Sequence, residues 1–296
     1  MRRSVVLALF MVAAAYGLFG QSEVRPTFQT ASIKRNTVNW GEPAQHSMGV
    51  GAHGAENASL MLLIQFAYAV RDSPHWLPLP ASQVVGGPDW INSLRYDIEA
   101  GPGGNADPKQ TWLMWQTLLA DQFKLRLHQE TRDLPIYDLT VAKSGSKLPA
   151  AREADCISFP PGTPPRYVPG KVDCGYVSGP FSLSGYTAGP LHIKGSKVHM
   201  ADLIRELTSV LDRPVLDKTE FTAEFDLDLS FTPDEDLKGF PGFGGPGDPG
   251  GSRLPTNPNL PNIFAALEEQ LGLKLVPAKG PVEVLVIDRA EKPAEN

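Results

Sequence analysis

The chain of 296 residues has few cysteines: Cys156 and Cys174 are the whole set, and no histidine lies between them. Zinc is held by sets of Cys, His and acidic ligands, so Asp155 and Asp173, which precede the cysteines, make a poor site alone. In an oxidising compartment, an even and closely spaced pair is typically a disulfide, which stabilises a loop of this size by roughly 3 kcal/mol. We expect a Cys156–Cys174 disulfide.

Positive charge is also scarce. The sequence holds 27 Lys and Arg against 33 Asp and Glu, a formal net charge of −6. Proteins that bind nucleic acid neutralise phosphates with clustered Lys and Arg, so this balance argues against a nucleic-acid partner.

Long apolar runs are limited to one, from Val5 to Phe19, behind the positively charged start at Arg2 and Arg3. This order is typical of a secretory signal, and it predicts a signal peptide over residues 1–20 and export to the periplasm or the extracellular space. A retained membrane anchor is the alternative, but the run is shorter than the ~20 residues that span a bilayer. After signal removal we expect no membrane span and a formal charge of −8, because Arg2 and Arg3 leave with the signal.

Catalytic motifs are missing as well. The sequence has no Gly-x-Ser-x-Gly elbow, and Ser144 and Ser146 belong to a polar turn. Residues 49–54 fit the dinucleotide pattern G-x-G-x-x-G, but no strand leads into them as that site requires. We therefore expect a glycine-rich turn there and no cofactor.

Metal and acid–base sites find little support. His192, His199 and Asp202 are near one another in the sequence, and imidazole and carboxylate groups suit zinc, but their spacing matches no known ligand pattern. The acidic residues have the spacing of solvated helix and strand faces rather than of a glycosidase pair; they are Glu268, Glu269, Asp226 and Asp228.

What the sequence does contain is a repeated apolar pattern. The spacing of Leu60, Leu63, Ile64, Ala67 and Val70 returns in Met200, Leu203, Ile204, Leu207 and Val210, and that of Leu119, Phe123, Leu125 and Leu127 returns in Leu267, Leu271, Leu273 and Leu275. Both copies must bury the same face. The pattern predicts an α+β fold of two tandem repeats, each a small, mostly antiparallel sheet packed with two helices.

The repeats set the expected boundaries. We expect the first over residues 21–150, a Pro/Gly-rich linker with the disulfide over 151–185, and the second over 186–296. Residues 239–261 hold 7 Gly and 6 Pro, which predicts a mobile insertion; ordering of this segment on a partner is the alternative.

Alternation and capping place the elements within each repeat. Helices are expected after Ser59, from Pro108, over 200–211 and over 263–271. Each repeat is expected to end in two strands separated by a turn, over 123–128 and 136–141, and over 273–276 and 282–287.

Four tryptophans form a candidate binding surface. Trp112 and Trp115 are three residues apart and share one helix face, while Trp76 and Trp90 lie in nearby loops. Such rings stack on sugars or hold a peptide, although core packing is their commoner use. The sequence therefore offers a ligand or partner groove in the first repeat only.

Three phrases carry a family resemblance: residues 118–128, 130–137 and 280–288. Together they resemble a large exported family of unknown function that is expanded in soil acidobacteria as Solibacter-type paralogues. The likeness runs from about Phe28 to the C-terminus. It implies no activity, substrate or catalytic residue.

The sequence thus favours a non-catalytic binding or assembly module of the cell envelope, with an envelope protein or an extracellular ligand as its partner. A looser likeness to the small modules that build rings in secretins rests on topology alone. A secreted hydrolase with a dispersed Ser, His and acid site is the alternative function.

Overall fold

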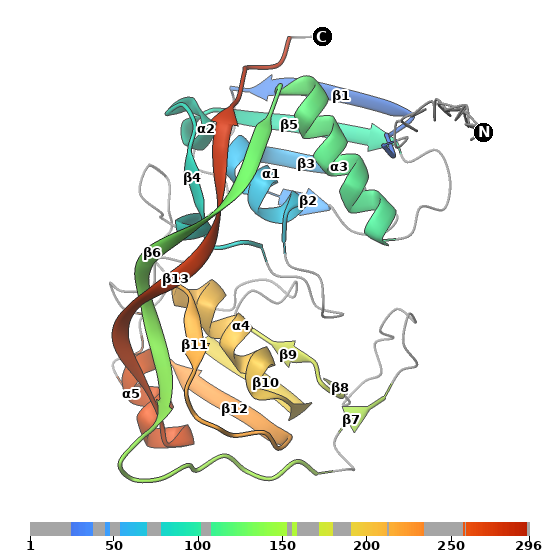
Figure 1. Ribbon diagram of the computed structural model, residues 1–296. Helices are drawn as coiled ribbons and strands as arrows, with labels where there is room; N and C mark the ends of the chain where they lie inside the picture. Colours follow the sequence, from blue (N-terminus) through green and yellow to red (C-terminus); the bar gives the residue numbers. More distant parts are fainter. Residues whose placement is uncertain are drawn as a thin grey trace, which may run out of the picture.

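The computed structural model describes residues 25–37, 45–47, 54–69, 78–101, 108–152, 156–158, 172–179, 191–211, 213–233, 257 and 259–294. They form a mixed α+β fold of small sheets and few helices (Figure 1).

One part of the molecule, here called the first lobe, is built on an antiparallel sheet with the strand order β1-β5-β3-β2. Its strands are β1 (Thr30–Asn36), β2 (Gln45–Ser47), β3 (Gly54–Ser59) and β5 (Arg95–Gly101). Its helices are α1 (Leu60–Ala67), α2 (Trp90–Ser93) and α3 (Pro108–Gln122), and the short 3-10 helix η1 (Ala81–Gln83) precedes β4.

Helix α1 begins where the sequence predicts, because the Ser59 side chain accepts a hydrogen bond from the N–H of Leu62 at 3.2 Å. The apolar side of α1 then packs with α3 on one face of the sheet. Residues from all three elements form one core, among them Leu63, Ile98 and Leu119, which are each no more than 1% exposed.

The second lobe is built on the sheet β12-β10-β9. Its elements are β9 (Val177–Ser178), β10 (Leu191–Val198), α4 (Met200–Leu211), β12 (Phe225–Phe231), α5 (Ile263–Ala266) and the π-helical turn η2 (Leu267–Leu271). The predicted linker also contributes the strand pair β7 (Cys156–Ile157) and β8 (Val172–Asp173). Because β9 pairs with β10, part of the segment expected as a linker belongs to the second sheet.

A central sheet with the order β11-β6-β13-β4 joins the lobes. Its two long strands are β6 (Arg126–Val141) and β13 (Leu273–Arg289), which run antiparallel from one lobe to the other (Figure 1). The short strands β4 (Val84–Gly86) and β11 (Val215–Asp217) flank them. The predicted turn within each closing hairpin is therefore wrong: each pair of expected strands is one uninterrupted strand.

The prolines that indicated turns lie at positions where the ladder needs no donor. Residue pairs alternate along an antiparallel ladder, and the N–H of Tyr137 points away from β13, to the carbonyl of Pro214. Pro135 and Pro281 have the same parity as Tyr137, so neither removes a hydrogen bond between β6 and β13. The long ladder therefore passes through both prolines.

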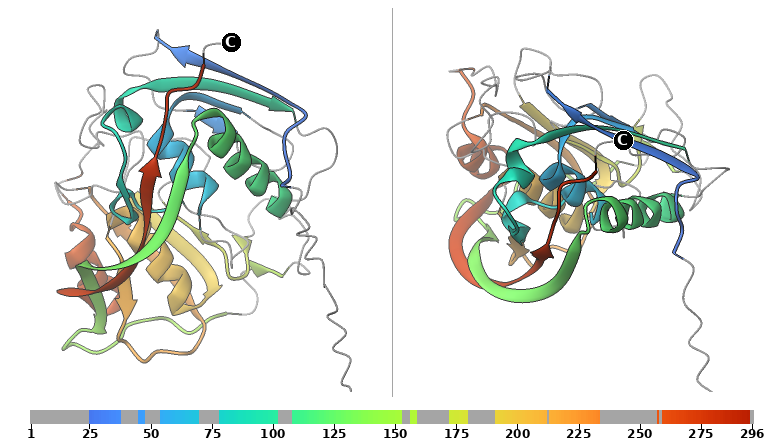
Figure 2. Two further views of the ribbon diagram at one scale, coloured as in Figure 1. Left: turned by 45° about the horizontal axis from the view of Figure 1, so that its top comes forward. Right: turned by 90° about the horizontal axis from the view of Figure 1, so that it is seen from above.

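Each long strand serves both cores. Leu127, near the start of β6, packs on the first core, and Leu139, near its end, lies in the second. Strand β13 runs the other way, from Leu275 in the second core to Ile287 in the first. Seen from above, the two strands curl together around one side of the molecule (Figure 2).

The flanking strands bind the long ones in one register. Strand β11 lies parallel to β6 with Val215 opposite Tyr137, and β4 lies parallel to β13 with Val84 opposite Leu285. Positions 137 and 285 are 148 residues apart, as are positions 139 and 287, which end the two pairings.

Both lobe sheets carry a bulge held by a carboxylate. Asn57 in β3 has a φ of 54°, and its N–H donates to Asp97 Oδ1 at 2.8 Å. Lys197 in β10 has a φ of 53°, and its N–H donates to Asp226 Oδ1 at 3.2 Å. Asp226 is 8% exposed, so the expectation that it lies on a solvated face is wrong: the bulge turns its carboxylate toward backbone donors.

Candidate functional site

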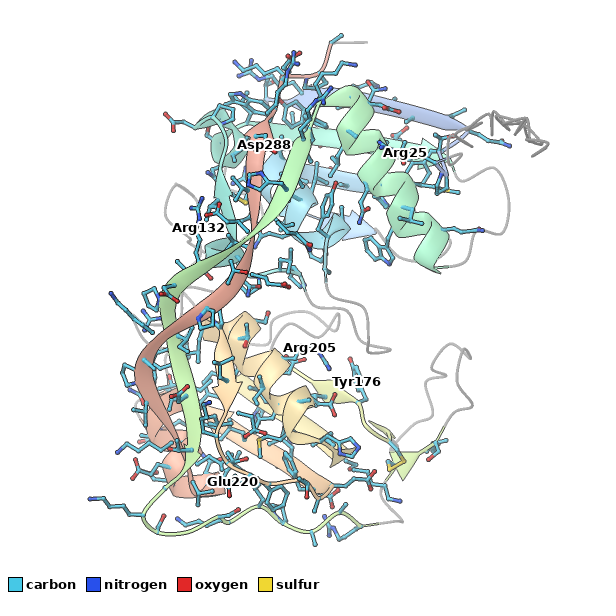
Figure 3. All side chains as sticks on the ribbon, in the orientation of Figure 1. Arg25, Arg132, Tyr176, Arg205, Glu220 and Asp288 are labelled. Carbon is cyan, nitrogen blue, oxygen red and sulfur yellow. A yellow bond between two sulfur atoms is a disulfide. The ribbon has the colours of Figure 1, made fainter. Side chains whose placement is uncertain are left out.

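A cavity of about 480 Å³ lies on the first lobe, against the outer side of α3. Its lining comes from the segment before β1, from the end of α1 and from one face of α3: Arg25, Pro26, Tyr68, Leu113, Gln116, Thr117 and Ala120. Arg25 lies beside α3 (Figure 3). A second hollow, beside Tyr96 and Pro293, has only about 50 Å³, so the larger cavity is the candidate site.

The helical repeat of α3 produces this lining. Positions 113, 116, 117 and 120 follow the i, i+3, i+4, i+7 spacing of one helix face. The neighbouring face carries Trp112 and Trp115, which are 4% and 0% exposed and fix the helix on the sheet. The core thus holds the cavity face of α3 in place.

The polar groups of the cavity are oriented by backbone contacts. Gln116 Nε2 donates to the carbonyl of Ala67 at 2.9 Å, which leaves its Oε1 as an acceptor. Thr117 Oγ1 donates to the carbonyl of Leu113 at 2.8 Å. These bonds tie α3 to the end of α1, where Tyr68 lies.

Tyr68 is a neutral hydrogen-bond donor beside a cation. Burial raises the pKa of its phenol above the ordinary value of 10.0, and the nearby positive charge of Arg25 offsets part of that shift. The phenol therefore keeps its proton at neutral pH. Within the described part of the chain, Arg25 makes no ion pair.

The structure places three of the four tryptophans of the expected groove. Trp112 and Trp115 are core residues, and the Trp115 ring meets Phe28 edge to face with centroids 5.4 Å apart. Trp90 begins α2 and is half-buried against the same core. Trp76 lies outside the described residues. The groove stays a prediction, with Trp90 as its one partly accessible described ring.

The serine and histidine closest to a catalytic pair lie on the second lobe. Ser230 Oγ and His192 Nδ1 are 2.9 Å apart across strands β12 and β10. The Gln270 side chain binds both the N–H and the carbonyl of Ser230, at 3.1 and 2.7 Å. Neither described cavity includes these residues.

The residues considered for a metal are not brought together. The Asp202 side chain accepts from the N–H of His199 at 2.9 Å at the start of α4, as in a helix cap, while His192 bonds Ser230. Among the described residues, no three His, Cys, Asp or Glu side chains form a group that would hold a metal ion. His128 is half-exposed and pairs with Asp288 at 2.8 Å across the long strands.

One buried carboxyl group is unusual. Glu206 of α4 is 4% exposed, and its Oε2 has no hydrogen-bond partner among the described residues. It fits only because residue 179 is glycine, since a Cβ atom there would collide with that oxygen. Burial raises the pKa of Glu206 from 4.5 to about 8; Arg205 opposes the shift and Asp202 adds to it. Figure 3 shows Arg205 and Tyr176 on this side of the second lobe.

The disulfide prediction is confirmed: Cys156 and Cys174 are bonded. The predicted signal peptide over residues 1–20 and almost all of the insertion at 239–261 lie outside the described residues.

Sequence reasoning missed the cavity. The spacing of Gln116, Thr117 and Ala120 on α3 was the available signal, but the tryptophans beside them drew attention to the opposite face. Nothing in the sequence indicated that Arg25 and Tyr68 would meet at this helix, because they belong to separate segments.

None of the described helices has the length and apolar character needed to span a membrane. Comparison with curated proteins and with solved structures gives no match. The model of one protein family does match, over residues 61–290, which cover both lobes and the long strands between them. The chain therefore belongs to the family described as protein of unknown function, DUF3738.

Proposed function

We propose that the protein is a non-catalytic binding module of the cell envelope and that its ligand site is the α3 cavity. The observation that carries this proposal is the lining itself. A volume of about 480 Å³ falls in the range of small-molecule sites. It is lined by a cation, a phenol and an amide beside apolar surface from Pro26 and Leu113.

The lining favours recognition over catalysis. The seven lining residues that the structure describes include no His, Cys, Asp or Glu, the side chains that most often transfer protons or attack a substrate. The one aliphatic hydroxyl, on Thr117, already donates to the Leu113 carbonyl. Such a site suits a ligand that is held and released unchanged.

We infer that the module is a duplicated unit. Positions 57 and 197, both bulged with left-handed backbone, are 140 residues apart, and 140 also separates the apolar patterns of α1 and α4. The two flanking strands keep one register relative to long strands 148 residues apart. A common ancestral unit explains why such unusual details occur twice.

Export is part of this proposal. A disulfide between Cys156 and Cys174 is typical of proteins that fold in oxidising compartments. The apolar run from Val5 to Phe19 has the form of a secretory signal. Mass spectrometry of the protein recovered from the periplasm or medium of an expressing cell should give a mature chain that begins near Gln21.

A binding screen tests the function. Thermal unfolding of the purified protein is measured against a library of small amphipathic compounds, and ligands raise the melting temperature by mass action. Ala120→Trp fills the cavity and should abolish each such shift, while Asp121→Trp, next to it on an exposed position, should leave the shifts intact. Shifts that survive Ala120→Trp would place the ligand elsewhere.

A hydrolase is the second candidate, favoured by the 2.9 Å contact between Ser230 and His192. The protein is screened on ester, peptide and glycoside substrates, on which a binding module is inert. Turnover that disappears in both Ser230→Ala and His192→Ala would replace the binding proposal with this one.

A further inference from the structure

The cavity offers two donors and one acceptor at fixed places. The donors are the guanidinium of Arg25 and the O–H of Tyr68, which lie close enough for the charge of one to act on the other. The acceptor is Gln116 Oε1, since the amide nitrogen of that side chain is bonded to Ala67. A ligand that satisfies all three carries an anionic group beside an N–H.

The remaining surface is apolar. Pro26, Leu113 and Ala120 line the cavity next to these polar groups, and Leu113 is 37% exposed. An exposed leucine beside a cation gives an apolar side chain a place to pack while its charged end is held.

We propose that the cavity binds the terminal carboxylate of an acylated amino acid with an apolar side chain. The carboxylate accepts from Arg25 and Tyr68, the adjacent amide N–H donates to Gln116 Oε1, and the side chain packs on Leu113 and Ala120. This inference rests on the proposed binding function and names the class of its ligand. No bond forms or breaks.

The second lobe does not repeat this site. Position 264 corresponds to Gln116 by the 148-residue spacing, and there the Phe264 ring packs on Tyr137 with centroids 5.5 Å apart. Thr208 corresponds to Tyr68 by the 140-residue spacing, and its hydroxyl accepts from the N–H of Val215 at 3.1 Å. Side chains bonded to their own lobe stand at these positions, so we expect one ligand per chain.

The test is titration calorimetry on the full mature chain with three probes. N-acetyl-leucine carries every feature, N-acetyl-leucine amide lacks the charge, and 4-methylpentanoate lacks the amide. N-acetyl-leucine should bind one to one and at least tenfold more tightly than either of the others, because a charge-assisted hydrogen bond or a buried amide bond is lost in each comparison. Equal affinity for the acid and its amide would overturn the inference.

Variants separate the roles. Arg25→Gln should weaken binding of N-acetyl-leucine about tenfold and leave the amide probe unchanged. Gln116→Met should weaken N-acetyl-leucine and leave 4-methylpentanoate unchanged. Arg126→Gln, an exposed arginine of the same lobe outside the cavity lining, is the matched control. An equal loss in Arg126→Gln and Arg25→Gln would show a general charge effect and contradict the site.

The source of the ligand is read from a further probe, an acetylated pentapeptide that ends in leucine. Affinity equal to that of N-acetyl-leucine indicates the end of a polypeptide, and a much lower affinity indicates a free small molecule. If neutral compounds bind in the cavity as tightly as the acid, the ligand class is wrong while the binding function stands. If neither these probes nor the compound library binds, the proposed function fails as well.

Discussion

The two lobes protect the same sheet edge in different ways. In the first lobe strand β1 covers the outer edge of β5, and the carbonyl of Gly101 accepts from the N–H of Gln29 at 2.9 Å. In the second lobe the outer edge of β12 meets the side chain of Gln270, whose amide binds both backbone groups of Ser230. A primary amide has the donor and acceptor of a peptide unit, so one side chain replaces part of a strand.

The helices of the lobes differ in the same direction. In the first lobe α3 has 15 residues, and its outer face leaves the cavity open. In the second lobe the corresponding helix is the four-residue α5 followed by η2, and Phe264 packs inward on Tyr137. If the units share an ancestor, only one of them has kept or gained space for a ligand.

The largest expected effect is in the two cores. Trp115→Ala should lower the free energy of unfolding by about 4 kcal/mol, and Ile263→Ala, at the corresponding position of the second lobe, by about 3 kcal/mol, because each deletes a fully buried side chain. Denaturant unfolding checks both. A loss below about 1 kcal/mol in either variant would contradict its place in a core.

The next effect depends on pH and belongs to the second lobe alone, since Phe66 stands where Glu206 would correspond. Burial raises the pKa of Glu206 to about 8 in the folded protein, so the folded state holds this proton more tightly than the unfolded chain. The resulting stability is fully present below about pH 4.5 and is lost as the pH rises through about 8.

Glu206→Gln removes this dependence. At pH 9 the variant should be more stable than the original protein by on the order of 3 kcal/mol, and at pH 4.5 the two should be alike. Unfolding free energies at both pH values check this, with the exposed Glu268→Gln as control. Parallel pH profiles for Glu206→Gln and the original protein would show that the carboxyl is not held neutral.

The smallest effect concerns the edge. Gln270→Ala should destabilise the protein by about 1–2 kcal/mol, because it removes two hydrogen bonds from the backbone of Ser230. Gln122→Ala, the counterpart in the first lobe, should change stability by less than about 0.5 kcal/mol, because Gln122 is exposed where β1 already covers the edge. Equal losses in the two variants would remove the contrast between the lobes.

Local signals in the sequence predicted much of the fold. Ser59 caps α1, Pro108 begins α3, and α4 spans 200–211 as its apolar spacing requires. Each of these features depends on residues within a few positions of one another. The closing strands were predicted with a false turn, because Pro135 and Pro281 indicate a turn unless the partner strand that tolerates them is known.

The candidate site was not predictable in the same way. Arg25, Tyr68 and Gln116 belong to three segments, and only packing brings them to one cavity. The solvated position expected for Asp226 failed for a related reason, since a bulge in a neighbouring strand turned it toward buried donors.

The sequence by itself determined the α+β class, the disulfide pair, most helix boundaries and the apolar faces that each lobe buries, because these follow from the spacing of side chains along the chain. Only the tertiary structure decided that β6 and β13 run unbroken between the lobes and exchange their ends between two cores. Strand pairing over more than a hundred residues is set by the partner strand, and no local pattern specifies that partner.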